Sequence, residues 1–137
     1  MIEEKVKAAI RDIKDFPKKG IVFKDITPIL SDPALTTEIT DALAENYAKL
    51  NIDAVMGIES RGFLWGILLA QKLNVPFIPV RKKGKLPYKT VSHKYDLEYG
   101  SAEIEVHEDA IEAGSSILIH DDLLATGGTA AAAANIV

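Results

Sequence analysis

The stretch from Ile117 to Thr129 constrains the fold of this chain more than any other. It begins with three apolar residues, 117–119, a pattern typical of a short buried parallel strand. Two adjacent carboxylates, Asp121 and Asp122, follow, and a loop of small residues then leads into the alanine-rich segment 130–134, which has high helix propensity. A strand, an acidic pair, a glycine loop and a helix in this order predict an α/β sheet with a ligand site at the carboxyl end of the strand.

The loop itself has the chemistry of a phosphate site. Its glycines let the backbone approach a ligand closely, and the free amides of a helix start bind phosphate with help from threonine hydroxyls. Its residues are Ala125, Thr126, Gly127, Gly128 and Thr129. Asp121 and Asp122 suit the hydroxyls of a sugar, or Mg²⁺ through water. An ordinary glycine-rich turn before a helix is the simpler alternative.

Two common phosphate motifs are excluded for this loop. No lysine follows the glycines, as it does in a kinase-type phosphate loop. The Gly-x-Gly-x-x-Gly spacing of a dinucleotide site is also absent.

Composition sets further limits. A length of 137 residues suits one domain with one core, and a net charge of −4 argues against non-specific binding of nucleic acid. The sequence has no apolar run long enough to cross a membrane, and its first residues are amphipathic, unlike an export signal. The absence of cysteine excludes disulfides and fits a cytoplasmic protein.

The first part of the chain predicts alternating helices and strands. Apolar periodicity favours helices over 2–14, 35–50 and 63–73, and strands over 52–58 and 77–80. The second helix is expected to begin at Ser31-Asp32-Pro33, and Pro79 favours an edge or strand-end position. A strand, helix and strand within 30 residues form a βαβ unit, which predicts a parallel sheet.

Arg61 follows the 52–58 strand directly, in the sequence Glu59-Ser60-Arg61-Gly62. It should therefore lie at the same edge of the sheet as the acidic pair. A guanidinium group donates to two oxygens at once, which suits a pyrophosphate. The alternative is a surface arginine that caps the strand end.

Residues 81–100 show no clear period and gather basic side chains. We expect a long loop here that binds an anion, and a strand at 102–106 that returns from it. A solvated, lysine-rich loop is the alternative. The cations are Arg81, Lys82, Lys83, Lys85, Lys89 and Lys94.

The acidic pair followed by Thr-Gly-Gly-Thr resembles the phosphoribosyl-pyrophosphate motif of the type I phosphoribosyltransferases. The form Asp-Asp-Leu-Leu-Ala-Thr-Gly-Gly-Thr is similar to that of the adenine-specific members. Similar segments of this family occur at Phe16–Pro28, at Ser60–Phe63 and at both ends of 81–100. The resemblance implies a mainly parallel central sheet flanked by helices, in a single domain over 1–137. It also implies an N-terminal hood at about 16–30 and a flexible lid at about 81–100.

The resemblance further implies purine salvage. The expected reaction converts adenine and phosphoribosyl pyrophosphate into AMP and pyrophosphate, with Mg²⁺ carried by the sugar pyrophosphate near Asp121 and Asp122 and not ligated directly by the protein. The site roles implied are Arg61 for neutralising pyrophosphate, Glu98 for proton transfer at the purine, Asp121 and Asp122 for the ribose hydroxyls, and residues 125–129 for the 5′-phosphate. Phe23 would stack on the base opposite Leu123, with backbone groups near Val22 and Lys24 reading its edge and Tyr99 contacting substrate from the lid. Arg81, Lys82 and Lys85 would reach the pyrophosphate of a neighbouring subunit, which implies a homodimer.

Two alternatives to adenine salvage remain at this point. One is a transferase for another base, such as hypoxanthine or orotate, against which the hood segment argues. The other is a regulator that binds phosphoribosyl pyrophosphate without turnover, although no nucleic-acid-binding module is visible. Lys24 departs from the arginine that many relatives carry. The family also continues past the helix at 130–134, so we expect a shortened form of lower stability, with an open edge along Ile117–Ile119.

Overall fold

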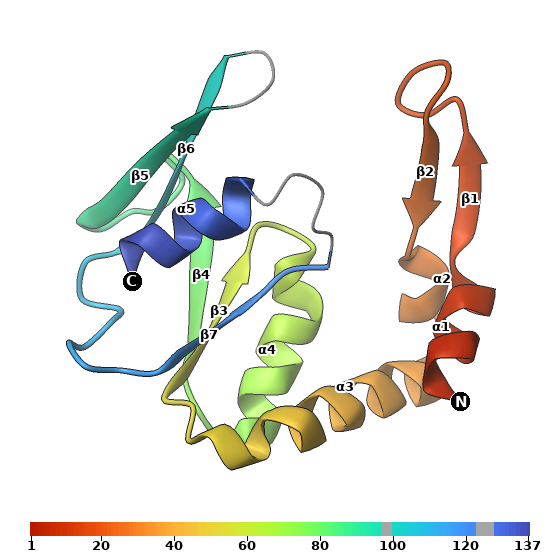
Figure 1. Cartoon of the computed structure of the whole chain (residues 1–137), viewed down its shortest axis with the longest axis horizontal. Coiled ribbons are helices and arrows are strands. Elements are labelled where there is room, and N and C mark those ends of the chain that lie inside the picture. Colours follow the sequence, from red (N-terminus) through yellow and green to blue (C-terminus); the bar gives the residue numbers. More distant parts are fainter. Residues whose placement is uncertain (97–99, 123–127) are drawn as a thin grey trace. The chain divides into compact units, whose positions relative to one another are not determined.

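The computed structural model describes residues 1–96, 100–122 and 128–137. By its internal contacts the chain divides into two compact units, Met1–Leu43 and Ala44–Val137, which are described separately below. Figure 1 gives the labels of the helices and strands. None of the helices in the described ranges combines the length and the apolar character that crossing a membrane requires.

The first unit contains a β-hairpin that the periodicity did not predict. Helix α1 (Ile2–Ala9) is followed by strands β1 (Arg11–Lys14) and β2 (Val22–Asp25), and then by the short helix α2 (Thr27–Leu30). The helix predicted over 2–14 is therefore wrong beyond Ala9. Ile13 has helical spacing from Ile10, but in the structure it pairs with Phe23 on the antiparallel partner strand. Pairing between segments distant in sequence has here outweighed a local helical pattern.

Helix α3 (Pro33–Tyr47) begins where the sequence predicted. The Asp32 carboxylate accepts a hydrogen bond from the Leu35 amide at 3.0 Å, which satisfies one of the unpaired donors of the first turn. A 3₁₀ turn, Ala48–Leu50, extends the helix to the predicted end.

The second unit is built on a five-stranded sheet in the order β5-β6-β4-β3-β7. Strands β3 (Ala54–Ile58), β4 (Phe77–Lys82) and β7 (Ile117–His120) run parallel, with β3 between the other two. The elements predicted at 52–58, 63–73, 77–80 and 117–120 are thus confirmed. Helix α4 (Gly62–Leu73) joins β3 to β4, and helix α5 (Gly128–Ile136) follows β7.

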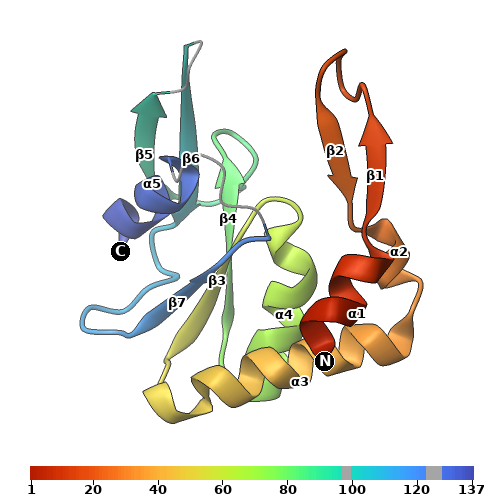
Figure 2. The same cartoon turned by 45° about the vertical axis from the view of Figure 1, so that its right-hand side comes forward.

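The segment predicted as an irregular loop at 81–100 contains a regular strand. Strand β5 (Thr90–Asp96) pairs antiparallel with β6 (Ser101–His107) over seven residue pairs, and the hairpin extends past the end of β4 (Figure 2). The prediction of a loop without secondary structure is therefore wrong, whereas the strand predicted at 102–106 is confirmed. Most of β5 remains exposed or half-buried, so its sequence shows little of the apolar signal on which a strand prediction depends.

The sequence predicted an edge or strand-end position for Pro79. The structure places it on the interior strand β4, but before the residues at which β4 pairs with β6. The described pairing of β4 with β6 joins Arg81 and Lys82 to β6, past the proline. On its other side Pro79 stands opposite Gly57 of β3. Pro79, which has no N–H group to donate, thus precedes the residues of β4 that pair with β6.

Helices α4 and α5 cover opposite faces of this sheet. Met56 and Ile58 of β3 belong to the core cluster that includes Ala132 and Ala133 of α5. Gly57 points to the other face, where a methyl group would lie 2.7 Å from the Gly62 carbonyl oxygen of α4. Helix α4 follows β3 on one face of the sheet, and helix α5 follows β7 on the other face. The carboxyl ends of these two neighbouring strands therefore form a switch point, where open α/β sheets bind ligands.

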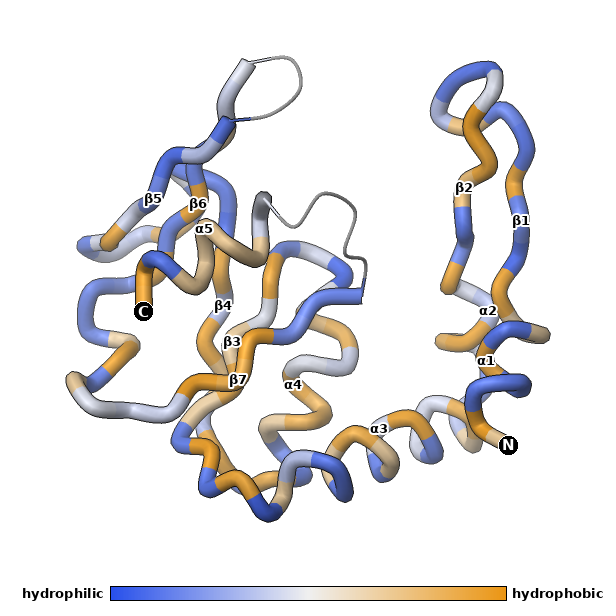
Figure 3. Tube along the Cα trace, in the orientation of Figure 1, coloured by the Kyte–Doolittle hydropathy of each residue, from blue (hydrophilic) through white to orange (hydrophobic). Residues whose placement is uncertain are grey.

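Strand β7 is the last strand of the sheet and pairs with β3 among the described residues. The open edge predicted along Ile117–Ile119 is therefore confirmed for this part of the chain. The strand is half-buried along its length, so the prediction of a buried strand was too strong. Ile117 and Ile119 pack against the core, and the apolar strand gives way to hydrophilic residues towards its carboxyl end (Figure 3).

Gly57 should not tolerate a side chain. In the Gly57→Ala variant the new methyl group would meet the Phe77 ring at 2.6 Å and the Gly62 carbonyl oxygen at 2.7 Å. We expect a loss of about 1–3 kcal/mol in the free energy of unfolding, measured by urea denaturation. Gly57→Ala should therefore cost less stability when it is added to the Phe77→Leu variant than when it is added to the wild type. Unchanged stability of Gly57→Ala would contradict the close packing of α4 on β3.

Candidate active site

The polar residues predicted from the sequence gather at the carboxyl ends of three neighbouring strands. Glu59 and Arg61 follow β3, and Asp121 and Asp122 follow β7. The basic segment 81–86, which we call the basic turn, begins with the last two residues of β4, Arg81 and Lys82. Since these strands are parallel, all three groups lie at one end of the sheet.

Arg61 and Asp122 form an ion pair between the ends of β3 and β7. The Arg61 Nε lies 3.1 Å from the Asp122 Oδ2, and the Asp122 side chain is only 13% exposed although its main chain is open to solvent. In phosphoribosyl pyrophosphate the pyrophosphate on C1 is adjacent to the C2 hydroxyl. A cation for the pyrophosphate and a carboxylate for the hydroxyls should therefore be neighbours, as Arg61 and Asp122 are.

Asp121 lies against the start of helix α4. Its Oδ1 accepts a hydrogen bond from the Asp122 amide at 2.9 Å, and a methyl group on Gly62 would lie 3.3 Å from the same oxygen. Burial raises the pKa of the Asp121 carboxyl group above its usual range, and the nearby Asp122 carboxylate adds to the rise. The Asp122 amide and the positive charge of Arg61 act in the opposite direction. A carboxyl group with a raised pKa next to a charged partner is a common mark of a functional site.

His120, the last residue of β7, is held within the protein. Burial lowers the pKa of His120, and the negative charge of Asp122 opposes that fall. Its Nε2 has no hydrogen-bond partner within the described residues. His120 is thus a half-buried strand residue that packs against its surroundings.

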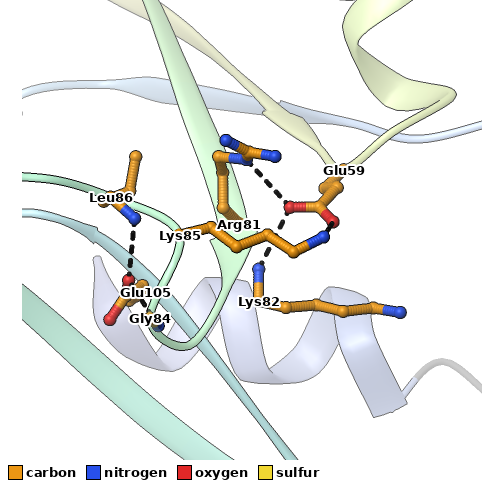
Figure 4. A network of polar contacts seen from close by, with 7 residues as sticks. All are labelled: Glu59, Arg81, Lys82, Gly84, Lys85, Leu86 and Glu105. Atoms are coloured by element: carbon orange, nitrogen blue, oxygen red, sulfur yellow. Dashed lines mark hydrogen bonds and ion pairs between the residues drawn. The ribbon is translucent and has the colours of Figure 1, made fainter.

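The basic turn converges on Glu59 (Figure 4). Arg81 Nε donates to Glu59 Oε1 at 2.9 Å, Lys85 Nζ donates to Oε2 at 2.6 Å, and the Lys82 amide donates to Oε1 at 3.3 Å. Burial would raise the pKa of the Glu59 carboxyl group, but the donors from Lys85, Arg81 and Lys82 together hold it below its usual value. Two of the three predicted pyrophosphate cations thus meet at the carboxyl end of β3, and Lys82 contributes its backbone there.

The described part of the phosphate loop is the start of helix α5. Thr129 Oγ1 lies 3.0 Å from the Tyr95 hydroxyl, which joins the first turn of α5 to the β5–β6 hairpin. Helix α5 begins at Gly128, two residues before the alanine-rich segment for which the sequence predicted a helix. The remaining predicted site residues of this loop and of the lid lie outside the described residues: Glu98, Tyr99, Leu123, Ala125, Thr126 and Gly127.

The hood residues belong to the first unit, and their role above a bound base stays a prediction. Val22 lies on strand β2 with 52% exposure, so its backbone and side chain are accessible. The Phe23 ring packs edge-on against Phe16 at a centroid distance of 5.1 Å. The Lys24 side chain donates to the Asp12 carboxylate at 2.6 Å. The role predicted for the Lys24 backbone in reading the base stays a prediction.

Comparison with known proteins agrees with this geometry. The family model for the phosphoribosyl transferase domain matches residues 25–137. The adenine phosphoribosyltransferase of Cytophaga hutchinsonii is 50% identical over all of this chain, which spans 76% of that protein. The chain belongs to the adenine phosphoribosyltransferase family.

Solved structures of this family share the fold. The crystal structure of the adenine phosphoribosyltransferase from Thermoanaerobacter pseudethanolicus superposes with a TM-score of 0.94 at 50% identity, and this chain covers 79% of it. The enzyme from Saccharomyces cerevisiae, solved with an imino-altritol bisphosphate and adenine, gives a TM-score of 0.93 at 44% identity. That match covers 99% of this chain and 80% of the yeast enzyme. The type I phosphoribosyltransferase fold expected from the sequence is confirmed.

The sequence reasoning missed two carboxylates of this phosphoribosyltransferase. Glu59 was quoted only as part of the loop around Arg61, yet it holds the basic turn. Glu105 stands on the polar face of β6, which alternation would place in solvent, but it is only 4% exposed. The basic residues of the 81–86 segment could have indicated the role of Glu59, because a cluster of cations near a strand end needs a carboxylate as counter-charge. Nothing in the sequence indicated that the basic turn folds over Glu105.

Glu59 should stabilise the fold in a pH-dependent way. Its pKa is lower in the folded chain than in the unfolded chain, so its contribution is present above the ordinary glutamate pKa and is lost as the pH falls through the folded value. In thermal melts between pH 7 and about pH 3, the melting temperature of Glu59→Gln should therefore fall less as the pH is lowered than that of the wild type. Lys85→Met should show part of the same change. Parallel curves for wild type and Glu59→Gln would contradict the assigned pairing.

Proposed function

We propose that this chain transfers the 5-phosphoribosyl group of phosphoribosyl pyrophosphate to adenine, which yields AMP and pyrophosphate. The observation that carries the proposal is the Arg61–Asp122 pair, which sets a pyrophosphate cation beside a carboxylate suited to a ribose hydroxyl at the sheet's switch point. The relatives that are adenine phosphoribosyltransferases, and the structure of the yeast enzyme with adenine, support adenine as the base. The lack of cysteine supports a cytoplasmic setting.

The chemistry required is cleavage at the anomeric carbon. The bond from C1 to the pyrophosphate oxygen breaks as the purine nitrogen approaches, and positive charge develops on the ribose. Arg61 offsets the charge on the departing pyrophosphate, while Asp121 and Asp122 hold the ribose hydroxyls and keep the ring in place. Residues 125–129 bind the 5′-phosphate, because the free amides at the start of a helix such as α5 suit an anion.

The base is held and its proton removed by the hood and the lid. Phe23 stacks on the purine opposite Leu123, the backbone near Val22 and Lys24 reads its edge, and Tyr99 contacts substrate from the lid. Glu98 accepts the proton that adenine loses as the new bond to C1 forms. Closure of the lid over this site would keep water away from the ribose cation.

Magnesium fits this site as a companion of the substrate. Within residues 1–96, 100–122 and 128–137 no three His, Asp or Glu side chains gather closely enough to hold a metal ion. The phosphate oxygens of the substrate would ligate the ion, and the nearby Asp121 and Asp122 would contact it only through its water molecules. Bound in this way, Mg²⁺ would neutralise charge on the leaving pyrophosphate.

Formation of AMP from radiolabelled adenine, phosphoribosyl pyrophosphate and Mg²⁺ is the direct test. Parallel reactions with hypoxanthine and guanine serve as controls. The proposal expects AMP from adenine and little product from the other two bases. Product from hypoxanthine or guanine in place of adenine, or no product from any base, would overturn it.

The acidic pair should control binding of the sugar. Asp121→Asn or Asp122→Asn removes a charged acceptor for a ribose hydroxyl, worth ~1.5–3 kcal/mol, so affinity for phosphoribosyl pyrophosphate should fall by tenfold or more. Calorimetric titration in the presence of Mg²⁺ measures this. The exposed Asp109, which follows β6, provides a matched control as Asp109→Asn. Wild-type affinity in both site variants would sink the assignment of the ribose contacts.

Glu98 should affect chemistry and not binding. Glu98→Gln keeps the size of the side chain but cannot take a proton, so turnover should fall by ~10²-fold or more. Affinity for phosphoribosyl pyrophosphate, measured by calorimetry, should stay near that of the wild type. Wild-type turnover under single-turnover conditions would remove Glu98 from the mechanism.

We also propose a homodimer in which Arg81, Lys82 and Lys85 act on the pyrophosphate of the neighbouring subunit. Sedimentation velocity should then report a dimer. When inactive Arg61→Met and Arg81→Met variants exchange subunits, a mixed dimer regains one intact site, so an equal mixture should recover about a quarter of the wild-type activity. No recovery in a mixture shown to exchange subunits would place Arg81 at the site of its own chain.

A further inference from the structure

The carboxylate of Glu105 is buried under the basic turn. Its side chain comes from β6 and the residue is 4% exposed. Its Oε1 accepts hydrogen bonds from the amides of Gly84 at 3.0 Å and Leu86 at 3.3 Å, as Figure 4 shows. Its Oε2 accepts a third hydrogen bond from the Thr90 hydroxyl at 3.1 Å.

These hydrogen bonds fix the conformation of the basic turn. A carboxylate removed from water is costly unless donors surround it, so Glu105 and the amides it binds require one another. Gly84 has a φ of +91°, which residues with side chains rarely adopt, and its amide donates directly to Glu105. The Lys85 amide closes the turn on the Lys82 carbonyl oxygen at 3.3 Å. Glu105 therefore holds the backbone at the centre of the basic turn.

The cationic side chains of the same turn meet a different carboxylate. Arg81, Lys85 and the Lys82 amide donate to Glu59, at distances between 2.6 and 3.3 Å. Figure 4 shows Glu105 at the backbone of Gly84 and Leu86, apart from the three donors around Glu59. Two cations and one amide around a single carboxylate form an arrangement that also suits a phosphate oxygen.

We propose that Glu105 is a positioning residue for pyrophosphate: by binding the amides of Gly84 and Leu86, it presets the basic turn so that Arg81, Lys82 and Lys85 present their donors together to one anion. This inference rests on the proposed function, which assigns pyrophosphate to these residues. A preset turn loses less conformational freedom when the anion binds, so the energy of the cation–phosphate contacts appears as affinity. Adenine does not contact the basic turn in the proposed function, so its binding should not depend on Glu105.

Two substitutions at Glu105 separate geometry from charge. Glu105→Gln keeps an oxygen for the two amides and can donate its NH₂ group to the Thr90 hydroxyl, so its affinity for pyrophosphate with Mg²⁺ should stay within about threefold of the wild type. Glu105→Leu leaves both amides without an acceptor, so its affinity for pyrophosphate and for phosphoribosyl pyrophosphate should fall by about tenfold or more. The KM for adenine at saturating phosphoribosyl pyrophosphate should remain within about twofold of the wild type in both variants.

Glu103→Leu provides the matched control. Glu103 is on the same strand and the same face as Glu105, but its side chain pairs with the Lys83 side chain at 3.1 Å. Calorimetric affinity of the Glu103→Leu variant for pyrophosphate should equal that of the wild type within the error of the titration. If Glu105→Leu does not fold, Thr90→Val removes one of the three hydrogen bonds and should weaken pyrophosphate binding by about threefold, with the KM for adenine unchanged.

The outcomes separate this inference from the proposed function. A wild-type protein that forms no AMP from any base overturns the function and the inference together. A wild-type protein that forms AMP, with Glu105→Leu binding pyrophosphate as tightly as the wild type, overturns the inference alone. An equal rise in the KM for adenine and in the pyrophosphate Kd also overturns it, because that result indicates general disruption of the fold. Weaker pyrophosphate binding in Glu105→Leu, with Glu105→Gln near wild type and adenine unaffected, supports it.

Discussion

The ion pair between Arg61 and Asp122 joins the two strand ends on which the site depends. At 3.1 Å it requires the carboxyl ends of β3 and β7 to lie side by side. The parallel pairing of β3 with β7 provides this, and reciprocal backbone and side-chain hydrogen bonds between Asp53 and Ser116 fix its other end. Helix α4 must also begin close to β7, which explains a glycine at position 62, where a methyl group would lie 2.9 Å from the His120 carbonyl oxygen. Small changes in either strand would therefore separate Arg61, the proposed pyrophosphate cation, from Asp122, the proposed acceptor for a ribose hydroxyl.

The site balances opposite charges at close range. Asp121 has a raised pKa because burial disfavours its charge, whereas the donors from Lys85, Arg81 and Lys82 lower the pKa of Glu59 in spite of burial. The raised pKa of Asp121 thus reflects its burial, and the lowered pKa of Glu59 reflects the donors through which it keeps the basic turn together. The Glu59 side chain is only 11% exposed, so its ion pairs are better shielded from water than surface pairs, and they hold the basic turn beside β3.

The parts of the fold that carry the site were predictable because their signals are local. The apolar run 117–119, the acidic pair after it and Arg61 after β3 each stand in a contiguous segment whose pattern predicts a strand end. The hairpin of β1 and β2 was missed because its evidence is the pairing of Ile13 with Phe23, ten residues apart, which no local period reveals. Glu105 was missed for the same reason. Its burial arises when residues 83–86 fold over β6, and alternation along β6 alone points it to solvent.

We propose that the carboxyl ends of β3 and β7 form one site for a sugar pyrophosphate. Backbone amide NMR during titration with phosphoribosyl pyrophosphate and Mg²⁺ can follow both strand ends at once. The amides of Arg61, Gly62 and Asp122 should shift together with a single Kd, while those of Asp53 and Ser116 at the opposite end of the two strands should not follow them. Shifts confined to one of the two strand ends, or different Kd values for Arg61 and Asp122, would contradict it.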